Sequence, residues 1–215
     1  MVDYNNFAKT FSNSRKNMKW EEINYFISLM SLDKPKTVLD VGCGNARLLG
    51  CLKSSKIELI DYLGIDLSSG LLGEAKKAYP KYNFLELDML DLKKINKKFS
   101  DIFFIASFHH LKTIEERLLV LSSLHNLLEK GGRIYMTNWA LNSPLNRKKY
   151  KSSQINGSEN RFGSLDYKIK IGVFSRFYHS FSLEELNYLF SKAGFKVLNN
   201  YLFENNKNYV SIIHI

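Results

Sequence analysis

The sequence predicts an α/β fold in which a mostly parallel sheet is covered by helices on both faces. Strand-like apolar runs alternate with helix-like segments from residue 37 to residue 138. The first run ends at Val41 and is followed by Gly42-Cys43-Gly44, which is typical of sheets that bind a nucleotide. Two further strand-like runs flank Glu204-Asn205-Asn206 and predict a C-terminal antiparallel hairpin.

The expected elements have recognisable limits. Helices are expected over residues 16–30, 46–54, 68–79, 114–128 and 182–192, parallel strands over 37–41, 59–66, 83–87, 101–106 and 133–138, and hairpin strands over 195–202 and 207–215. The long helix at 114–128 is expected to end at Gly131-Gly132, because glycine commonly ends helices. The last helix begins with Ser182-x-x-Glu185, the pattern of a capping box, and stops at Gly194.

The Gly-x-Gly loop favours an adenosine cofactor over two other phosphate sites. Glycine at positions 42 and 44 lets the backbone turn sharply and approach a ligand closely. Ala46 and Arg47 follow, where an NAD site has a third glycine and a P-loop has Gly-Lys-Ser/Thr. The loop alone could also be an ordinary tight turn, so its context decides the interpretation.

Three acids lie at strand ends: Asp40, Asp66 and Asp88. Asp66 is positioned to accept both ribose hydroxyls, while Asp88 can take an adenine amino group and Met89 can cover the ring. For each acid singly, the alternative is an N-cap of the next helix. Because parallel strands end at one edge of the sheet, the three together predict an adenosyl site.

Composition fits one domain spanning residues 1–215, since a chain of this length can bury a single core. No run approaches the roughly 18 to 20 apolar residues of a membrane span, and the N-terminus has no apolar signal core. We therefore expect a cytoplasmic protein without a membrane partner. Cys43 and Cys51 are the only cysteines and lack the spacing of a metal knuckle, so no metal site or disulfide framework is expected.

Residues 139–181 lack a steady period and combine basic with aromatic side chains. The formal net charge of the chain is +10, which favours an anionic partner, although solvated lysines are the ordinary alternative. A mixture of cations and rings can grip phosphates and stack unpaired bases. We expect this segment to form an acceptor-binding insertion or a lid, with a disordered linker as the alternative.

These motifs together resemble those of the class I S-adenosylmethionine-dependent methyltransferases, over residues 33–137. Val38-Leu39-Asp40-Val41-Gly42-Cys43-Gly44 is similar to their first motif, and Asp66 and Asp88-Met89 are similar to the second and third. The fourth and fifth correspond to residues 99–111 and 127–136. The resemblance implies S-adenosyl-L-methionine as cofactor and a Rossmann-like, mostly parallel seven-stranded sheet with a C-terminal antiparallel hairpin.

Several segments also resemble one family, the tRNA wobble-uridine methyltransferases that esterify 5-carboxymethyluridine, including the methyltransferase domain of the AlkB-like fusion enzymes. The resemblance is carried by Phe11-Ser12-x-Ser14-Arg15, Ser107-Phe108-His109-His110-Leu111, Trp139-Ala140-Leu141, Ser175-Arg176-Phe177-Tyr178-His179-Ser180-Phe181 and Asn208-Tyr209-Val210. The chain departs from the family at Ala46, where glycine is usual, at Phe177 and at Asn208. The resemblance implies tRNA as partner and a small zinc-binding activator subunit as a possible second one.

The expected reaction is an in-line methyl transfer in which the protein mainly aligns the acceptor. A carboxylate acceptor is already ionised at neutral pH and needs no general base. We expect Arg176 and His179 to hold the acceptor nucleotide or a phosphate, with Trp139 and Tyr178 as stacking surfaces. His109 is a candidate proton carrier or a structural group. The alternative is that His179 and Tyr178 only fix the loop to the core.

The candidate acceptor-side residues are thus Arg176, His179, Trp139 and His109. The candidate cofactor-binding residues are Arg15, which could pair with the methionyl carboxylate, Asp40, Gly42, Cys43, Gly44, Asp66, Leu67, Asp88, Met89 and Ala106. Three functions stay open at this point: a tRNA methyltransferase, a small-molecule O-, N- or C-methyltransferase of the same fold, and a non-catalytic cofactor-binding regulatory module.

Overall fold

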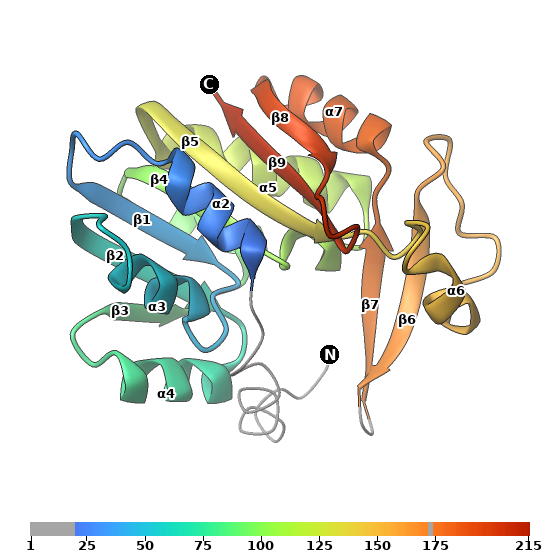
Figure 1. Cartoon of the computed structure of the whole chain (residues 1–215), viewed down its shortest axis with the longest axis horizontal. Helices are drawn as coiled ribbons and strands as arrows, with labels where there is room; N and C mark the ends of the chain where they lie inside the picture. Colours follow the sequence, from blue (N-terminus) through green and yellow to red (C-terminus); the bar gives the residue numbers. More distant parts are fainter. Residues whose placement is uncertain (1–19, 172–173) are drawn as a thin grey trace.

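A computed structural model describes residues 20–171 and 174–215 of the chain (Figure 1). The helices are α2 (Glu21–Leu29), α3 (Arg47–Lys53), α4 (Ser69–Ala78), α5 (Ile114–Leu127), α6 (Arg147–Tyr150) and α7 (Leu183–Lys192), with 3-10 turns η1 (Met89–Lys94), η2 (Phe108–His110) and η3 (Lys151–Ser153). The strands are β1 (Lys36–Val41), β2 (Leu59–Asp66), β3 (Asn83–Glu86), β4 (Phe99–Ile105), β5 (Leu128–Trp139), β6 (Leu165–Ile171), β7 (Phe174–Ser180), β8 (Lys196–Leu202) and β9 (Asn208–His214).

Seven of these strands form one sheet in the order β3-β2-β1-β4-β5-β9-β8. The first five are parallel, and β9 pairs antiparallel with both β5 and β8. The predicted fold class, including the C-terminal hairpin, is therefore confirmed. The N-terminal helix is described from Glu21, so the expectation for residues 16–19 lies outside the described residues.

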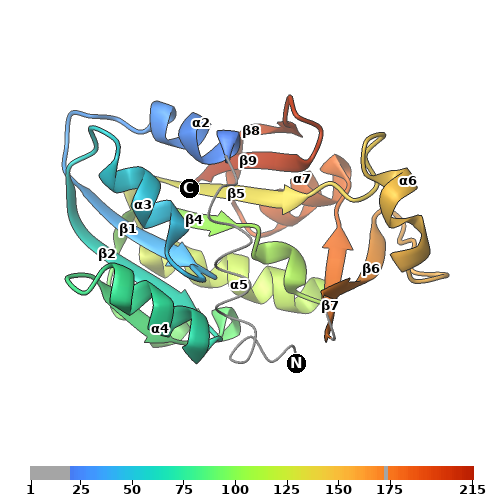
Figure 2. The same ribbon diagram turned by 60° about the horizontal axis from the view of Figure 1, so that its bottom comes forward.

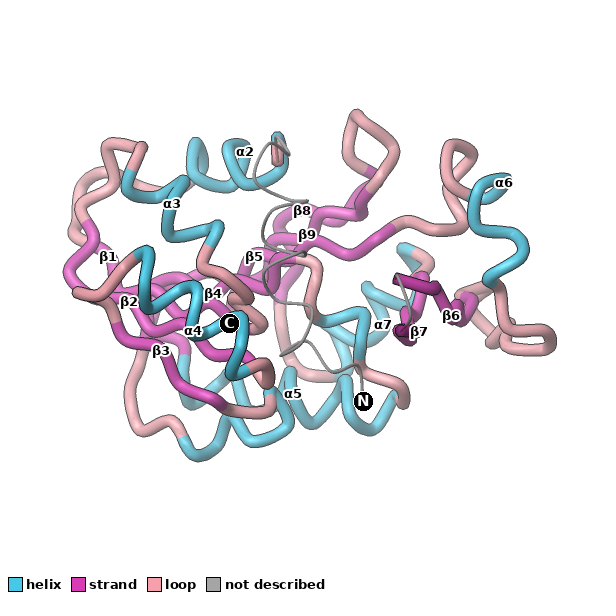
Figure 3. Tube along the Cα trace, turned by 90° about the horizontal axis from the view of Figure 1, so that it is seen from below, coloured by secondary structure: helices cyan, strands magenta, loops and turns pink. Residues whose placement is uncertain are grey.

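Helices cover both faces of the sheet, with α2 and α3 on one side and α5 and α7 on the other (Figure 3). Alternation along β1 explains why both faces need a cover. Val38 packs with α2 and α3, while Leu39 and Val41 pack with α5 and α7. Both faces of the central strand are apolar because each is buried under a helical layer.

The helix before β5 ends earlier than Gly131-Gly132, which corrects the expected boundary. Helix α5 stops at Leu127, β5 starts at Leu128, and the two glycines lie inside the strand at a shift in its register with β4. Gly131 has φ +79°, and a Cβ on Gly132 would come within 2.7 Å of the Ser100 carbonyl oxygen. These glycines permit a bulge and a close approach of strands instead of ending a helix.

The segment expected to be irregular contains a regular antiparallel pair, which is a second correction. Strands β6 and β7 form a separate two-stranded sheet from Leu165 paired with Ser180 to Ile171 paired with Phe174. This hairpin stands beside the end of β5 and away from the main sheet (Figure 2). The missed signal was the alternation of apolar and polar residues from Tyr167 to Ile171.

The capping box expected at α7 is only half formed. The Ser182 hydroxyl accepts from the Glu185 N–H at 3.1 Å, but the Ser182 N–H donates to Ser164 Oγ at 2.8 Å. The Glu185 carboxylate is instead buried in contact with Arg117 and His179. Ser182 therefore caps the helix alone, while Glu185 links separate parts of the fold.

Candidate active site

The site lies where the order of the parallel strands reverses. Strands β1 and β4 are neighbours in the sheet, yet β2 follows β1 outward on the opposite side from β4. The connections that follow β1 and β4 therefore run in opposite directions, and α/β proteins bind ligands in the crevice that this leaves outside the carboxyl ends of the strands. The Gly42 and Ser107 positions form the floor of this crevice. A Cβ on Gly42 would lie 2.4 Å from the Ser107 Cβ, and Gly42 has φ +75°.

A cavity of about 1080 Å³ opens at this point. This volume lies at about the upper limit of the roughly 300–1,000 Å³ that is usual for ligand pockets. Its lining combines the loops after β1, β2 and β4 with the side of β7, and it includes Asp40, Gly42, Cys43, Gly44, Asp66, Leu67, Met89, Ala106, Ser107, His109, His110, Lys112, Trp139, Lys168, Arg176 and Tyr178. The cavity therefore has room for two molecules or for one large molecule.

Asp40 is a buried carboxyl group in the wall of the cavity. Its Oδ2 accepts a hydrogen bond from the Tyr62 hydroxyl at 2.7 Å, while Oδ1 has no hydrogen-bond partner among the described residues. Burial raises the pKa of Asp40 to about 7, against the opposing effect of the Tyr62 hydrogen bond. A group that contributes a positive charge or an N–H donor at this place would stabilise the ionised form.

Asp66 connects the loop after β1 with the start of α4. Its Oδ2 accepts from the Gly44 N–H at 2.9 Å, and its Oδ1 accepts from the Ser68 N–H at 2.9 Å. Burial raises the pKa of Asp66, while these backbone hydrogen bonds and the charge of Arg176 oppose the shift. Each oxygen still has a second lone pair for a ligand hydroxyl. The predicted ribose-binding carboxylate thus lies on the cavity in a fixed orientation.

The remaining cofactor-side candidates are placed in different ways. Cys43, Leu67, Met89 and Ala106 line the cavity, and burial raises the pKa of the Cys43 thiol well above its ordinary value. Asp88 is not one of the lining residues, and its Oδ1 accepts from the Leu90 N–H at 2.9 Å as the N-cap of η1. This is the capping alternative raised for that acid. Arg15 lies outside the described residues.

His109 and His110 have fixed and opposite tautomers. The Trp139 backbone N–H donates to His109 Nδ1 at 3.1 Å, so the proton of His109 is on Nε2. His110 Nδ1 lies 2.9 Å from the Phe177 carbonyl oxygen, so His110 carries its proton on Nδ1. Burial lowers the pKa of both imidazoles well below the ordinary value, and the charge of Arg176 adds to the effect. Both rings are therefore neutral at physiological pH and are poor proton carriers.

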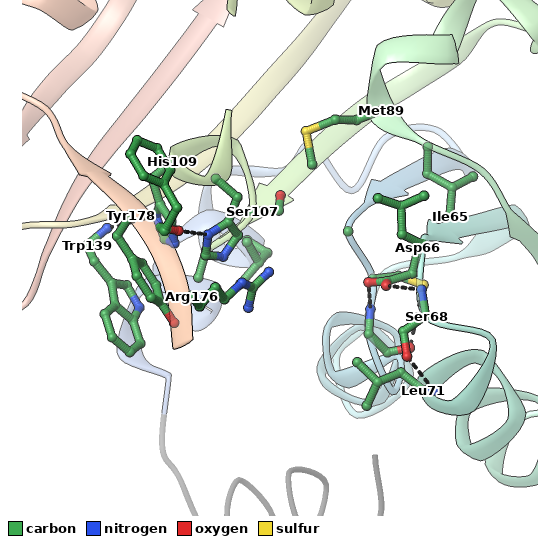
Figure 4. A pocket seen from close by; sticks show the side chains of 18 of the residues that line it. Ile65, Asp66, Ser68, Leu71, Met89, Ser107, His109, Trp139, Arg176 and Tyr178 are labelled. Atoms are coloured by element: carbon green, nitrogen blue, oxygen red, sulfur yellow. Dashed lines mark hydrogen bonds between the residues drawn. The ribbon is translucent and has the colours of Figure 1, made fainter. Parts of the chain in front are cut away.

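An aromatic and cationic group forms the wall opposite the cofactor-side residues. Trp139 and Tyr178 are stacked with ring centroids 5.1 Å apart, and the Arg176 guanidinium lies 5.8 Å from the Tyr178 ring centroid. Figure 4 shows these side chains with His109 on one side of the cavity and Asp66, Ser68 and Leu71 on the other. The cavity thus has an acidic, glycine-lined half and a basic, aromatic half.

His179 does not line the cavity and instead fixes the base of the β6–β7 hairpin. Its Nδ1 lies 2.6 Å from Asp166 Oδ1 and its Nε2 lies 2.8 Å from Glu185 Oε2. Glu185 Oε1 in turn accepts from Arg117 at 2.9 Å. Burial raises the pKa of Glu185, but hydrogen bonds that include those from His179 and Asn160 outweigh it and hold the value at about 2. This buried network holds β7, and therefore Arg176 and Tyr178, against α5 and α7.

Sequence reasoning assigned no individual role to His110, Lys112, Lys168, Trp20 or Ser107, all of which line the cavity. His110 is next to the candidate His109 in the same motif. The alternation of apolar and polar residues along β6 could have indicated that Lys168 lies on the polar face of that strand. The close approach of Ser107 to Gly42 depends on the pairing of β1 with β4, which no local pattern shows. Among the described residues, no group of three or more potential ligands could hold a metal ion.

The sequence of the chain matches a known protein family. The profile of a family described as "Methyltransferase domain" matches residues 15–200. Several relatives are named as tRNA (carboxymethyluridine(34)-5-O)-methyltransferases. The protein of Saccharomyces cerevisiae is 33% identical over 147 residues, and alkbh8 of Xenopus tropicalis is 32% identical over 148 residues. These alignments cover 68% and 69% of this chain, but only 50% and 22% of the relatives.

Solved structures show the same fold at low sequence identity. A methyltransferase of Bacteroides fragilis in complex with S-adenosylhomocysteine has a TM-score of 0.68 at 18% identity, over 94% of this chain and 79% of that one. A protein of Pyrococcus horikoshii OT3 has a TM-score of 0.70 at 19% identity, over 96% of this chain and 90% of that one. No helix among residues 20–171 and 174–215 has the length and apolar character needed to cross a bilayer. The chain belongs to the methyltransferase domain family and has the fold of the S-adenosylmethionine-dependent methyltransferases.

Proposed function

We propose that the protein transfers a methyl group from S-adenosylmethionine to a carboxymethylated wobble uridine of tRNA or to a closely related modified base. The observation that carries the proposal is the division of one cavity into two chemically different halves. Gly42, Gly44 and Asp66 line one half, and Arg176 lies beside Trp139 and Tyr178 in the other. The first half suits an adenosyl cofactor and the second an anionic acceptor that carries a flat base.

The cofactor-side residues fit S-adenosylmethionine on three counts. Asp40 presents a buried carboxyl oxygen without a hydrogen-bond partner among the described residues. Gly44 has no Cβ to hold a ligand away from the backbone, whereas Ser107 fills the Cβ position of Gly42. Asp66 has lone pairs for the ribose hydroxyls. When bound, the cofactor supplies an electrophilic methyl group, so the protein residues need only bind it, orient the acceptor and exclude water.

Arg176 is the residue proposed to hold the carboxylate of the acceptor. A guanidinium binds a carboxylate through two parallel hydrogen bonds, which would fix the orientation of the attacking oxygen. Because a free carboxyl group has a pKa near 4, the acceptor is ionised at neutral pH without help from a base. The lowered pKa of His109 and His110 agrees with this requirement, since an imidazole with a low pKa is a weak base.

The surroundings of the cavity favour RNA over a small metabolite. Lys112 and Lys168 line the acceptor half, and the chain has a formal net charge of +10. Two of the relatives are named for methylation of carboxymethyluridine 34 in tRNA. In this proposal, residues 139–181 form the acceptor wall, and His179 acts through the hairpin that it fixes rather than by contact with the acceptor.

The test is transfer of labelled methyl groups from S-adenosylmethionine to bulk tRNA or to a small-metabolite extract. The family resemblance leaves open whether an activator subunit is needed, so the assay is run with the chain alone and with such a subunit added. Label in tRNA, identified as a methyl ester by nucleoside mass spectrometry, supports the proposal. Label only in the extract indicates a small-molecule methyltransferase, and label in neither indicates a non-catalytic module.

Arg176→Lys separates carboxylate recognition from general charge. Lysine keeps the positive charge but loses the two parallel donors of the guanidinium. We expect the rate of methyl transfer to fall by about 10- to 100-fold while binding of S-adenosylhomocysteine changes little, in line with the cost of misplacing a reacting group. Equal transfer rates in the variant and the wild type would contradict the assignment of Arg176.

A further inference from the structure

A second cavity of about 650 Å³ adjoins the first one. Trp20 and Trp139 line both cavities, so the two share a wall. Three separate parts of the chain enclose the second cavity: the start of α2, the connection from β5 to α6, and the turn between β8 and β9. Neither the cofactor nor the acceptor group of the proposed reaction requires this space.

Hydrogen bonds hold these three parts together. Asn205 and Asn208 each donate from Nδ2 to Glu22 Oε1, at 2.9 and 2.7 Å, which ties the β8–β9 turn to α2. Asn146 Nδ2 donates to the Ala140 carbonyl oxygen at 3.0 Å, and the Ser143 hydroxyl donates to the Asn206 carbonyl oxygen at 2.8 Å. The walls of the second cavity are therefore built by specific contacts between distant segments.

Asn208, one of the lining residues, has a buried polar atom with no hydrogen-bond partner in the part of the chain that the structure describes. Asn208 is 6% exposed, and its Nδ2 must face Glu22 because a carboxylate can only accept. Its Oδ1 is consequently oriented as an acceptor, and it has no hydrogen-bond partner among the described residues. A buried acceptor without a donor is costly, and a ligand that offers an N–H or O–H group would remove that cost.

The rim of the cavity is basic and aromatic. Lys149 and Lys207 are exposed, and the Lys149 ammonium lies 5.1 Å from the Tyr150 ring centroid. Tyr150 and Trp139 both line the cavity. Aromatic rings that stack bases beside lysines that neutralise phosphates are the usual means of binding single-stranded nucleic acid. The two glutamates of the lining lie at the start of α2, and Glu22 is already occupied by amide donors.

We propose that the second cavity binds the nucleotide adjacent to the methyl acceptor in the same RNA strand. Its base would contact Tyr150 or Trp139 and donate a hydrogen bond to Asn208 Oδ1, and its phosphate would lie between Lys149 and Lys207. This inference rests on the proposed function and extends it, because it makes the protein select a strand of RNA instead of an isolated nucleoside.

The test compares the wild type with Lys149→Ala/Lys207→Ala in binding to an anticodon stem-loop RNA. We expect the double variant to bind the RNA about tenfold more weakly at moderate salt. The slope of log affinity against log salt should fall by about 0.7, since the contact with one phosphate is lost. Binding of S-adenosylhomocysteine should be unchanged. Lys53→Ala is the matched control, because Lys53 is also an exposed lysine that lies over a tyrosine ring, 5.4 Å from the Tyr79 centroid.

Tyr150→Ala and Tyr150→Phe test the stacking surface separately from charge. We expect the alanine variant to lose about tenfold in RNA affinity and the phenylalanine variant to retain it, with thermal melting used to show that both are folded. If the wild type methylates tRNA and all these variants match its KM and affinity, the second site is refuted while the proposed function stands. If the wild type neither binds nor methylates RNA, both proposals fail.

Discussion

Replacement of Asp40 by asparagine should stabilise the fold at neutral and alkaline pH and weaken cofactor binding. Asp40 is fully buried, and burial raises its pKa to about 7 from an ordinary value of 3.8. The folded state therefore binds this proton more tightly than the unfolded state does. As pH rises from about 4 to about 7, ionisation of Asp40 must decrease the free energy of unfolding, and the size of this decrease stays constant above that range.

The size of the effect follows from the two pKa values. A difference of about three pH units corresponds to about 4 kcal/mol when the cost is fully developed, at about 1.4 kcal/mol per unit. About 3 kcal/mol of this loss of stability develops between pH 5 and pH 8. Asparagine cannot ionise, so the stability of Asp40→Asn relative to the wild type should rise by that amount over this interval.

Urea unfolding at pH 5, 6, 7 and 8 measures the difference directly. Asp91→Asn serves as a control for a general charge effect, because Asp91 is a partly exposed residue paired with Lys94. Tyr62→Phe removes the hydrogen bond that lowers the pKa of Asp40, so its stability should keep falling at pH values where the wild type has levelled off. A stability difference between Asp40→Asn and wild type that does not change with pH would refute the assignment of a buried, titrating carboxyl group.

The same variant should bind S-adenosylhomocysteine at least tenfold more weakly at pH 8, because the ionised carboxylate is the form that suits an ammonium or N–H donor. For the wild type, affinity should increase as pH rises through 7. Calorimetry at the same pH values would show this. Undiminished affinity in Asp40→Asn would mean that the unpartnered oxygen of Asp40 does not contact the cofactor.

Three further substitutions test the packing around the site. Gly42→Ala should destabilise the fold by at least about 2 kcal/mol and abolish cofactor binding, because the new Cβ would lie 2.4 Å from the Ser107 Cβ at a residue with positive φ. Gly73→Ala is the control: a Cβ at Gly73 would have no neighbour within 4 Å, so this variant should be neutral or stabilising in urea unfolding. Ala46→Gly should leave the melting temperature unchanged or raise it, because Ala46 has φ 62°, and a clear loss of stability would show that its methyl packing outweighs the backbone strain. Glu185→Gln should lower the free energy of unfolding by about 3 to 5 kcal/mol at pH 7, because the buried Arg117 guanidinium loses its carboxylate partner. The difference from the wild type should shrink as pH falls from 4.5 toward 2. A decrease below about 1 kcal/mol at pH 7 would contradict the role of the Arg117–Glu185–His179 network.

The parallel sheet could be predicted because its signals are local. Strands β1 and β2 are apolar runs that end at a glycine or an acid, so the sequence alone places Gly42, Gly44 and Asp66 at one edge of the sheet. These three residues do line one cavity. Asp88 shows the limit of the same reasoning, because an acid after a strand can cap a turn as readily as it can face a ligand, and the backbone geometry decides between them.

The acceptor side was harder to predict because its contacts join distant segments. His179 is held by Asp166, thirteen residues before it, and by Glu185, six residues after it. Neither spacing is one at which side chains of a single helix or strand are neighbours, so no local pattern predicts these contacts. The opposite tautomers of His109 and His110 depend on backbone groups of Trp139 and Phe177. The hairpin β6–β7 is a different case, because alternation along β6 was present in the sequence.

The central claim is that the loops after β1 and β2 and the carboxylates of Asp40 and Asp66 bind the adenosyl cofactor. A crystal structure of the protein with S-adenosylhomocysteine tests it most directly. We expect the ligand in the larger cavity, with its ribose on Asp66 and its amino acid group near Gly42 and Asp40. A ligand bound at another place, or an empty cavity at saturating concentration, would contradict the account.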